Sequence, residues 1–259
     1  MKLSIAGLWQ VSPLTDLTIP QDDICFPAKL SQVLPSTLTE EVISQQEWHL
    51  MHDIELDSEL SSPAIDLVLD KVSHYAEVRV NGVAVYDCHG DEQEYRKDIR
   101  SYLQPGRNRF EILFLAHDED WLLEEEQQNS HHVGGSIQPI GIHSEPYLHC
   151  MTNVRLNQVE VEQVWHHGGG CEVLVHLDYQ ALQFGLVSVG VQFNGVTLQL
   201  PVDMRTSRLT ALFQVEAPRV TCPKEPQKHP LCVFIEEHCY TFSVALAPDQ
   251  APKRFTLST

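Results

Sequence analysis

The sequence predicts an all-β protein built from two β-sandwich domains. Three observations lead to this prediction: apolar and polar residues alternate in many short runs, Asn-Gly turns separate two pairs of these runs, and the net charge changes abruptly near residue 150. Residues 1–150 contain 9 basic and 26 acidic residues (net −17), whereas residues 151–259 contain 8 and 10 (net −2). Such a step indicates two domains with different surfaces, and we place their boundary at Cys150–Thr152.

The first half of the chain contains three clear strand signals. In residues 47–56, Trp48, Leu50, Ile54 and Leu56 alternate with Glu47, His49, Asp53 and Glu55. Residues 77–80 and 83–86 flank Asn81-Gly82, and this dipeptide is typical of a two-residue β-hairpin turn because both of its residues tolerate positive φ. A further strand is predicted at 110–114, after the Pro105-Gly106 turn.

The second half of the chain also shows alternating strand signals and an Asn-Gly turn. Val173, Val175, Leu177 and Tyr179 alternate with Glu172, His176 and Asp178. Residues 187–193 lead into Asn194-Gly195, and residues 196–200 return, which predicts a second antiparallel hairpin. A late strand is predicted at 240–246. Many short strands joined by turns favour β-sandwiches over an α/β enzyme.

Helical signals are few. Residues 96–103 can form one or two turns, with Ile99 and Leu103 on one face. Residues 118–128 are the better helix candidate, because Asp118 can cap the N-terminus and acidic residues fill the first turn. Residues 129–146 are rich in Gly and Pro and are predicted to form an irregular loop.

Composition excludes two classes of partner. The chain has 17 Lys and Arg against 36 Asp and Glu, a formal net charge of −19. Phosphate binding requires clustered cations, so we expect neither nucleic acid nor an anionic membrane surface as a partner. The N-terminus lacks the apolar core of a signal peptide, and no run approaches the ~20 apolar residues that span a bilayer.

Cysteine usage indicates a reducing compartment. The seven cysteines are Cys25, Cys88, Cys150, Cys171, Cys222, Cys232 and Cys239. Their number is odd and no Cys-x-x-Cys pair occurs, so a disulfide framework is not expected in a chain of this size. We therefore expect a cytoplasmic protein.

Motifs with their own chemistry are absent from the sequence. The acidic pairs lie next to one another in single segments, which is typical of a solvated face and does not place two carboxylates across a pocket. His131-His132 and His166-His167 lie beside glycines, but no metal-binding spacing is present, so no metal site is expected. No phosphate-binding or dinucleotide-binding loop occurs, and no cofactor is expected. Trp121 either stacks on a sugar ring or anchors its own short helix.

Several segments, in their order along the chain, resemble glycoside hydrolase family two, the family of β-mannosidases, β-galactosidases and β-glucuronidases. They are Leu8-Trp9-Gln10, residues 69–82 ending in Asn81-Gly82, residues 95–103 followed by Pro105-Gly106-x-Asn108, residues 141–148 beginning with Gly141-Ile142, and His229-Pro230-Leu231-Cys232. The resemblance implies a galactose-binding-like jelly roll over residues 1–151 and an immunoglobulin-like β-sandwich over residues 152–259.

The resemblance also limits the chemistry that we expect. Family members continue into a barrel with two catalytic glutamates, one of which follows an Asn; this sequence ends at Thr259 and contains no Asn-Glu dipeptide, so we expect no catalytic residue. In β-mannosidases a Trp- and Asp-rich loop of the first domain reaches the substrate. The corresponding stretch here, residues 131–139, contains neither residue type. The candidate carbohydrate contacts are Trp121, His131, His132 and Gln138.

The expected function is that of a non-catalytic carbohydrate-binding or accessory module. One alternative is a subunit of a split glycoside hydrolase whose barrel belongs to another chain. Another is a module that only binds proteins, including other copies of itself. The charge is compatible with a neutral sugar or a protein partner and does not choose between them.

Overall fold

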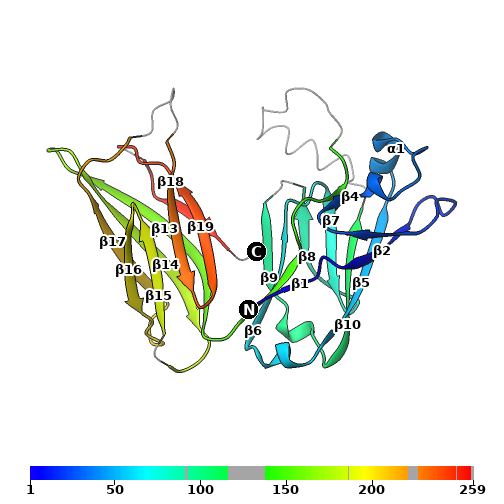
Figure 1. The fold of residues 1–259 in the computed structure, drawn as a ribbon, viewed down its shortest axis with the longest axis horizontal. Helices are drawn as coiled ribbons and strands as arrows, with labels where there is room; N and C mark the ends of the chain where they lie inside the picture. The colour runs from blue at the N-terminus through cyan, green and yellow to red at the C-terminus, as the bar shows by residue number, and fades with distance from the viewer. Residues whose placement is uncertain (91–92, 116–137, 186, 221–226, 249, 258–259) are drawn as a thin grey trace. The chain divides into compact units, whose positions relative to one another are not determined.

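The chain divides into two structural units, one spanning Lys2–Cys150 and the other beginning at Met151. The computed structural model describes residues 1–90, 93–115, 138–185, 187–220, 227–248 and 250–257. Both units consist of antiparallel sheets, and the all-β prediction is confirmed (Figure 1). None of the helices in the described part of the chain has the length and hydropathy of a membrane-spanning segment.

The first unit is a jelly-roll β-sandwich. Its six-stranded sheet has the order β3-β2-β5-β10-β7-β8 and consists of β2 (Leu8–Pro13), β3 (Asp22–Cys25), β5 (Trp48–Leu56), β7 (Tyr75–Val80), β8 (Val83–His89) and β10 (Gly106–Phe114). Its four-stranded sheet has the order β1-β12-β6-β9 and consists of β1 (Lys2–Ser4), β6 (Ala64–Asp70), β9 (Glu94–Asp98) and β12 (Tyr147–Met151). A short pair joins β4 (Ala28–Lys29) to β11 (Gly141–Ile142).

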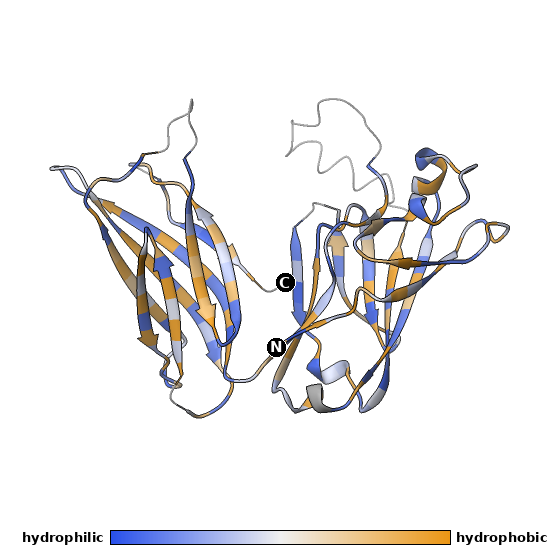
Figure 2. Cartoon of the chain, in the orientation of Figure 1, coloured by the Kyte–Doolittle hydropathy of each residue, from blue (hydrophilic) through white to orange (hydrophobic). Residues whose placement is uncertain are grey.

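The core of this unit lies between its two main sheets. It combines Val11, Leu50 and Phe110 of the larger sheet with Leu67 and Leu148 of the smaller one. Because successive side chains of a strand point to opposite faces, these apolar residues alternate with polar ones along most strands, as Figure 2 shows. The alternation that predicts the fold is therefore the alternation that forms the core.

Several short elements of the first unit were not predicted from the sequence. The helix α1 (Glu40–Ser44) begins after Thr39, whose hydroxyl accepts a hydrogen bond from the Val42 amide at 3.3 Å. Buried Trp48 fastens this helix by donating its indole N–H to the Ile43 carbonyl at 3.0 Å. The described residues of this unit also form three 3-10 helices: η1 (Leu30–Gln32), η2 (Ser58–Ser61) and η3 (Arg100–Tyr102).

The helical turns predicted at residues 96–103 are only partly correct. Residues up to Asp98 belong to strand β9, and only η3 is helical. The cause is tertiary: β9 pairs with β6, and Arg96 forms a buried ion pair with Asp66 of that strand. The better helix candidate, residues 118–128, lies outside the described residues.

The second unit is an immunoglobulin-like sandwich of two four-stranded sheets. One has the order β17-β14-β13-β20 and consists of β13 (Val154–Trp165), β14 (Cys171–Ala181), β17 (Arg208–Val215) and β20 (Lys253–Thr256). The other has the order β16-β15-β18-β19 and consists of β15 (Ser188–Phe193), β16 (Val196–Pro201), β18 (His229–Ile235) and β19 (His238–Val244). Its core includes Val159, Val175, Val191, Leu231 and Tyr240 from both sheets.

Both predicted Asn-Gly hairpins are confirmed. Asn81 and Gly82 connect β7 to β8 with φ values of 51° and 80°. Asn194 and Gly195 connect β15 to β16 with φ values of 48° and 80°. Positive φ at both positions is the conformation of the turn type that matches strand twist, which is why this dipeptide fixes the register of each hairpin.

Candidate functional site

The structure describes only one of the four candidate sugar contacts, Gln138. Trp121, His131 and His132 lie outside the described residues, so their role as sugar contacts stays a prediction. Gln138 is described and is exposed. The chain beyond it is fixed, because the Ser73 hydroxyl donates to the Pro139 carbonyl at 2.8 Å and the Leu30 amide donates to the Ile140 carbonyl at 2.9 Å. Gln138 therefore lies next to a fixed point of the first unit.

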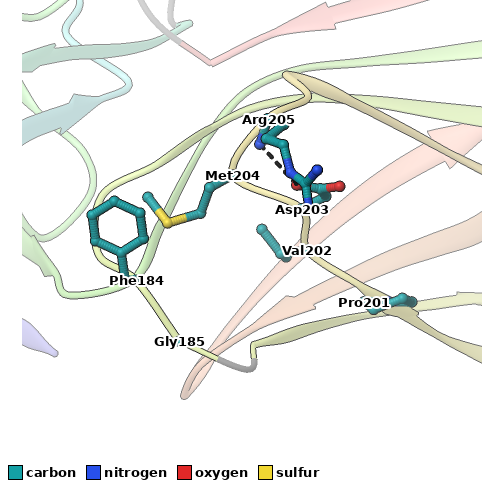
Figure 3. A pocket seen from close by; sticks show the side chains of 7 residues that line it. All are labelled: Phe184, Gly185, Pro201, Val202, Asp203, Met204 and Arg205. Atoms are coloured by element: carbon teal, nitrogen blue, oxygen red, sulfur yellow. Dashed lines mark hydrogen bonds and ion pairs between the residues drawn. The ribbon is translucent and has the colours of Figure 1, made fainter.

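A cavity lies in the second unit, between two loops. One loop follows β14 and the other joins β16 to β17. The cavity measures about 540 Å³ and is lined by Phe184, Gly185, Pro201, Val202, Asp203, Met204 and Arg205 (Figure 3). We call it the Phe184 cup. Its volume lies within the range of small-ligand sites.

Hydrogen bonds within the chain fix the loop between β16 and β17, which lines the cup. The Tyr179 hydroxyl donates to the Asp203 carbonyl at 2.8 Å and lies 2.8 Å from the Thr206 hydroxyl. The Asp203 carboxylate accepts the Arg205 amide at 2.8 Å, and the Val202 amide donates to the Val187 carbonyl at 2.8 Å. The loop between β16 and β17 thus has a fixed backbone, and its side chains are displayed from a rigid base.

The side chains of the cup combine an aromatic face with charge. The Phe184 residue is 95% exposed, although phenylalanine usually gains free energy from burial. Figure 3 shows its ring beside the Met204 side chain, with Asp203 and Arg205 further along the same loop. Arg205 Nε lies 3.6 Å from Asp203 Oδ1, and the Arg205 side chain is 92% exposed. An exposed ring can stack on the C–H face of a sugar, and the charged pair can bind hydroxyl groups.

Sequence reasoning did not single out this cup. The available signal was Phe184 next to Gly185 between two predicted strands, because an aromatic residue at this position belongs to the apolar face of neither strand. The partner loop carries no periodic pattern, and folding alone brings Asp203 and Arg205 next to Phe184.

Two smaller cavities lie in the same unit. One, of about 320 Å³, is lined by Phe193, Asn194, Val196, Leu212, Phe213 and Gln214. The other, of about 200 Å³, includes His166 and Glu172, whose Nε2 and Oε1 atoms lie 3.7 Å apart. His166 thus has a carboxylate neighbour, while the described residues contain no group of three or more His, Cys, Asp or Glu arranged to hold a metal ion.

The outer face of the six-stranded sheet carries an ion-pair cluster centred on Asp53. Arg109 donates to its carboxylate from Nε at 2.9 Å and from Nη2 at 3.1 Å, and Arg107 donates from Nη2. The hydrogen bonds from Arg109 are the main reason why the pKa of Asp53 falls to about 2. A carboxylate held ionised in this way stabilises a surface and is a poor proton donor.

Asp53 should therefore make stability depend on acid pH. Its pKa is lower in the folded chain than the ordinary value of 3.8, so its contribution is complete above pH 4 and is lost as the pH falls towards 2. Because the arginines are largely exposed, we expect Asp53→Asn to cost only about 1 kcal/mol or less at pH 7. Urea unfolding at pH 7 and at pH 2.5 measures this, and an equal cost at both values would contradict it.

Comparison with known proteins identifies a family match and a set of similar structures. The family model for the glycosyl hydrolase 2 galactose-binding domain-like family matches residues 35–165. The β-D-mannosidase from Dictyoglomus thermophilum is similar with a TM-score of 0.63 and 16% identity, over 99% of this chain and 36% of that one. A β-galacturonidase from Eisenbergiella tayi has a TM-score of 0.59 and 15% identity, over 95% and 43%.

A third structure, a β-glucuronidase from Bifidobacterium dentium, has a TM-score of 0.58 and 12% identity, over 95% of this chain and 48% of that one. At such identities the likeness shows the fold. The chain thus spans less than half the length of each of these three proteins. A comparison with curated protein sequences gives no match.

Proposed function

Because the chain belongs to the glycosyl hydrolase 2 galactose-binding domain-like family, we propose that it is a non-catalytic accessory module of a family 2 glycoside hydrolase and that its ligand is carbohydrate. The observation that carries the proposal is the extent of the match. Between 95% and 99% of this chain aligns with 36–48% of proteins named as a mannosidase, a galacturonidase and a glucuronidase.

Three described carboxylates are held in ion pairs with arginines, and this supports a non-catalytic role. Glycoside hydrolysis by a retaining mechanism requires two carboxyl groups facing each other about 5 Å apart, one of which holds a proton. Asp53 and Asp66 are engaged by arginines, and Glu160 is bound by both Arg208 and Arg254. In the Phe184 cup, Asp203 is the one acid among the seven described lining residues. These groups suit ion pairing and ligand binding.

We assign the carbohydrate contact to the Phe184 cup. The exposed ring supplies a stacking platform, and Asp203 and Arg205 supply an acceptor and a donor at its side. The fixed backbone of the partner loop reduces the entropy lost on binding. Since these are two polar groups and one ring in an open cup, we expect weak binding to one or two sugar units.

Calorimetric titration of the full chain with methyl mannoside, galactoside and glucuronide tests this function. We expect heat with at least one sugar, and an affinity about fivefold weaker in Phe184→Ala, because loss of a stacking partner costs on the order of 1 kcal/mol. Phe234→Ala is the matched control, since Phe234 is 36% exposed on β18, outside the cup. No heat with any sugar contradicts carbohydrate binding, and an unchanged affinity in Phe184→Ala contradicts the assignment to the cup.

A second candidate function is docking onto a hydrolase partner. It is favoured by the loop after β2, where Leu14 is 41% exposed and Leu17 is 79% exposed, which are apolar surfaces suited to burial in an interface. The test is enzymatic: the chain is added to each family 2 hydrolase of its source organism, and the hydrolysis of nitrophenyl glycosides is followed. Stimulation that is lost in Leu17→Asp supports docking, and no stimulation of any of them contradicts it.

We also propose a reducing, cytoplasmic location. In support, none of the six described cysteines forms a disulfide: Cys25, Cys88, Cys150, Cys171, Cys232 and Cys239. Fractionation of the source cells, with an alkylation count of thiols in the native protein, tests this; recovery outside the cytoplasm would contradict it.

A further inference from the structure

Two cysteines lie side by side on the outer face of the second sheet of the second unit. Cys232 belongs to β18 and is opposite Thr241 of β19, and Cys239 lies two residues before Thr241 on that strand. Side chains at such positions point to the same face of a sheet. Their sequence neighbours Leu231, Val233 and Tyr240, among others, point the other way into the core. The two thiols therefore share the solvent side.

Both thiols lie near the same group, the Thr241 hydroxyl. Thr241 Oγ1 lies 4.0 Å from Cys232 Sγ and 3.9 Å from Cys239 Sγ. Cys239 is exposed and Cys232 is partly exposed. A small ion from solvent can therefore reach both sulfur atoms.

The pairing register of β18 and β19 disfavours a disulfide between Cys232 and Cys239. Cys239 is paired with Phe234 and Cys232 with Thr241, so the two cysteines are diagonal neighbours. Diagonal residues have Cα atoms about 7–8 Å apart, whereas a disulfide joins Cα atoms about 4.4–6.8 Å apart. An ion with metal–sulfur bonds of about 2.3 Å bridges sulfurs up to ~4.6 Å apart. Such an ion suits diagonal cysteines better than a disulfide does.

We propose that Cys232 and Cys239 form a binding site for a soft, thiophilic metal ion, with Cu(I) as its ligand. Thiolate sulfur selects Cu(I), which binds stably with two ligands, whereas Zn²⁺ takes four. Two sulfurs match Cu(I), since the described residues offer no larger cluster of His, Cys, Asp and Glu. On binding, each thiol releases its proton to solvent and donates an electron pair, and copper stays in its +1 state. This proposal does not depend on carbohydrate binding.

The test uses the reduced full chain under anaerobic conditions, with Cu(I) offered as its coloured bicinchoninate complex. We expect the chain to remove one equivalent of copper from the dye. Cys232→Ser and Cys239→Ser should each bind copper at least tenfold more weakly. Cys25→Ser is the matched control, because Cys25 is an exposed cysteine of the first unit, on β3, and it should bind as the unchanged chain does. Circular dichroism and a urea midpoint for each variant show that it is folded.

Three results would overturn the proposal. The first is no transfer of copper from the dye. The second is equal transfer to Cys232→Ser, Cys239→Ser and the unchanged chain. The third is found in a chain that takes up no copper: after exposure to peroxide its mass is lower by two hydrogens. Cys232 and Cys239 would then form a disulfide and not a metal site.

Discussion

Asp66→Ala is expected to destabilise the first unit by about 3–5 kcal/mol. Asp66 and Arg96 form an ion pair in which the side chains are 0% and 2% exposed. Removal of the carboxylate leaves the buried Arg96 guanidinium without its Asp66 partner, and removing one partner of a buried ion pair is strongly destabilising. Because most of this loss is the cost of leaving a charge desolvated, it exceeds the net contribution of the ion pair to the free energy of unfolding.

Urea unfolding followed by tryptophan fluorescence measures this loss, because Trp9 and Trp48 lie in the core of the same unit. The double change Asp66→Leu with Arg96→Met removes both charges and should recover much of the stability. Arg107→Ala is the exposed comparison, with an expected loss of about 1 kcal/mol or less, since the Arg107 side chain is 65% exposed. A loss in Asp66→Ala no larger than in Arg107→Ala would refute the argument.

Gly141→Ala is expected to destabilise the first unit by about 3 kcal/mol or more, which exceeds the usual cost of an added methyl group in a core. A Cβ atom at this position would lie 2.4 Å from the Ala28 carbonyl oxygen and 2.9 Å from Lys29 Cα. Both are backbone atoms, so neither can rotate away. The pair of β4 and β11 would have to separate, together with the bond from the Gly141 amide to the Ser73 hydroxyl at 2.9 Å.

The midpoint of thermal unfolding measures the effect, with Gly168→Ala as the matched control. A Cβ at Gly168 meets nothing within 4 Å, so that change should leave the midpoint nearly unchanged. If Gly141→Ala behaved like Gly168→Ala, β4 and β11 would not be as closely packed as described.

The parts of the fold that could be predicted are those that the sequence encodes locally. Asn-Gly dictates a hairpin because both residues accept positive φ, and alternation dictates which face of a strand is buried. The Pro-Gly-x-Asn segment is a subtler case. Asn108 is fully buried, and its side chain donates to the carbonyls of Gln104 at 2.7 Å and Gly106 at 2.9 Å. The motif therefore builds the turn before β10.

The parts that could not be predicted depend on contacts between distant segments. β4 and β11 have two residues each, too few for any periodic signal, and they exist because they pair with each other. β9 overrides a helical pattern through its contact with β6. The Phe184 cup needs two loops that only the finished sandwich brings together. Of the sugar contacts named from the sequence, Gln138 alone lies among the described residues.

The position of β20 has a consequence for self-association. β20 pairs with Gln158, Val159, Glu160 and Val161 of β13, and so it covers the middle of that strand. An uncovered strand edge presents unpaired N–H and C=O groups that can recruit the same edge of another molecule. β20 is itself the edge strand of its sheet, but it has only four residues. A proteolytic cut that removes it would expose the twelve-residue β13 as the new edge, a longer template for pairing between molecules.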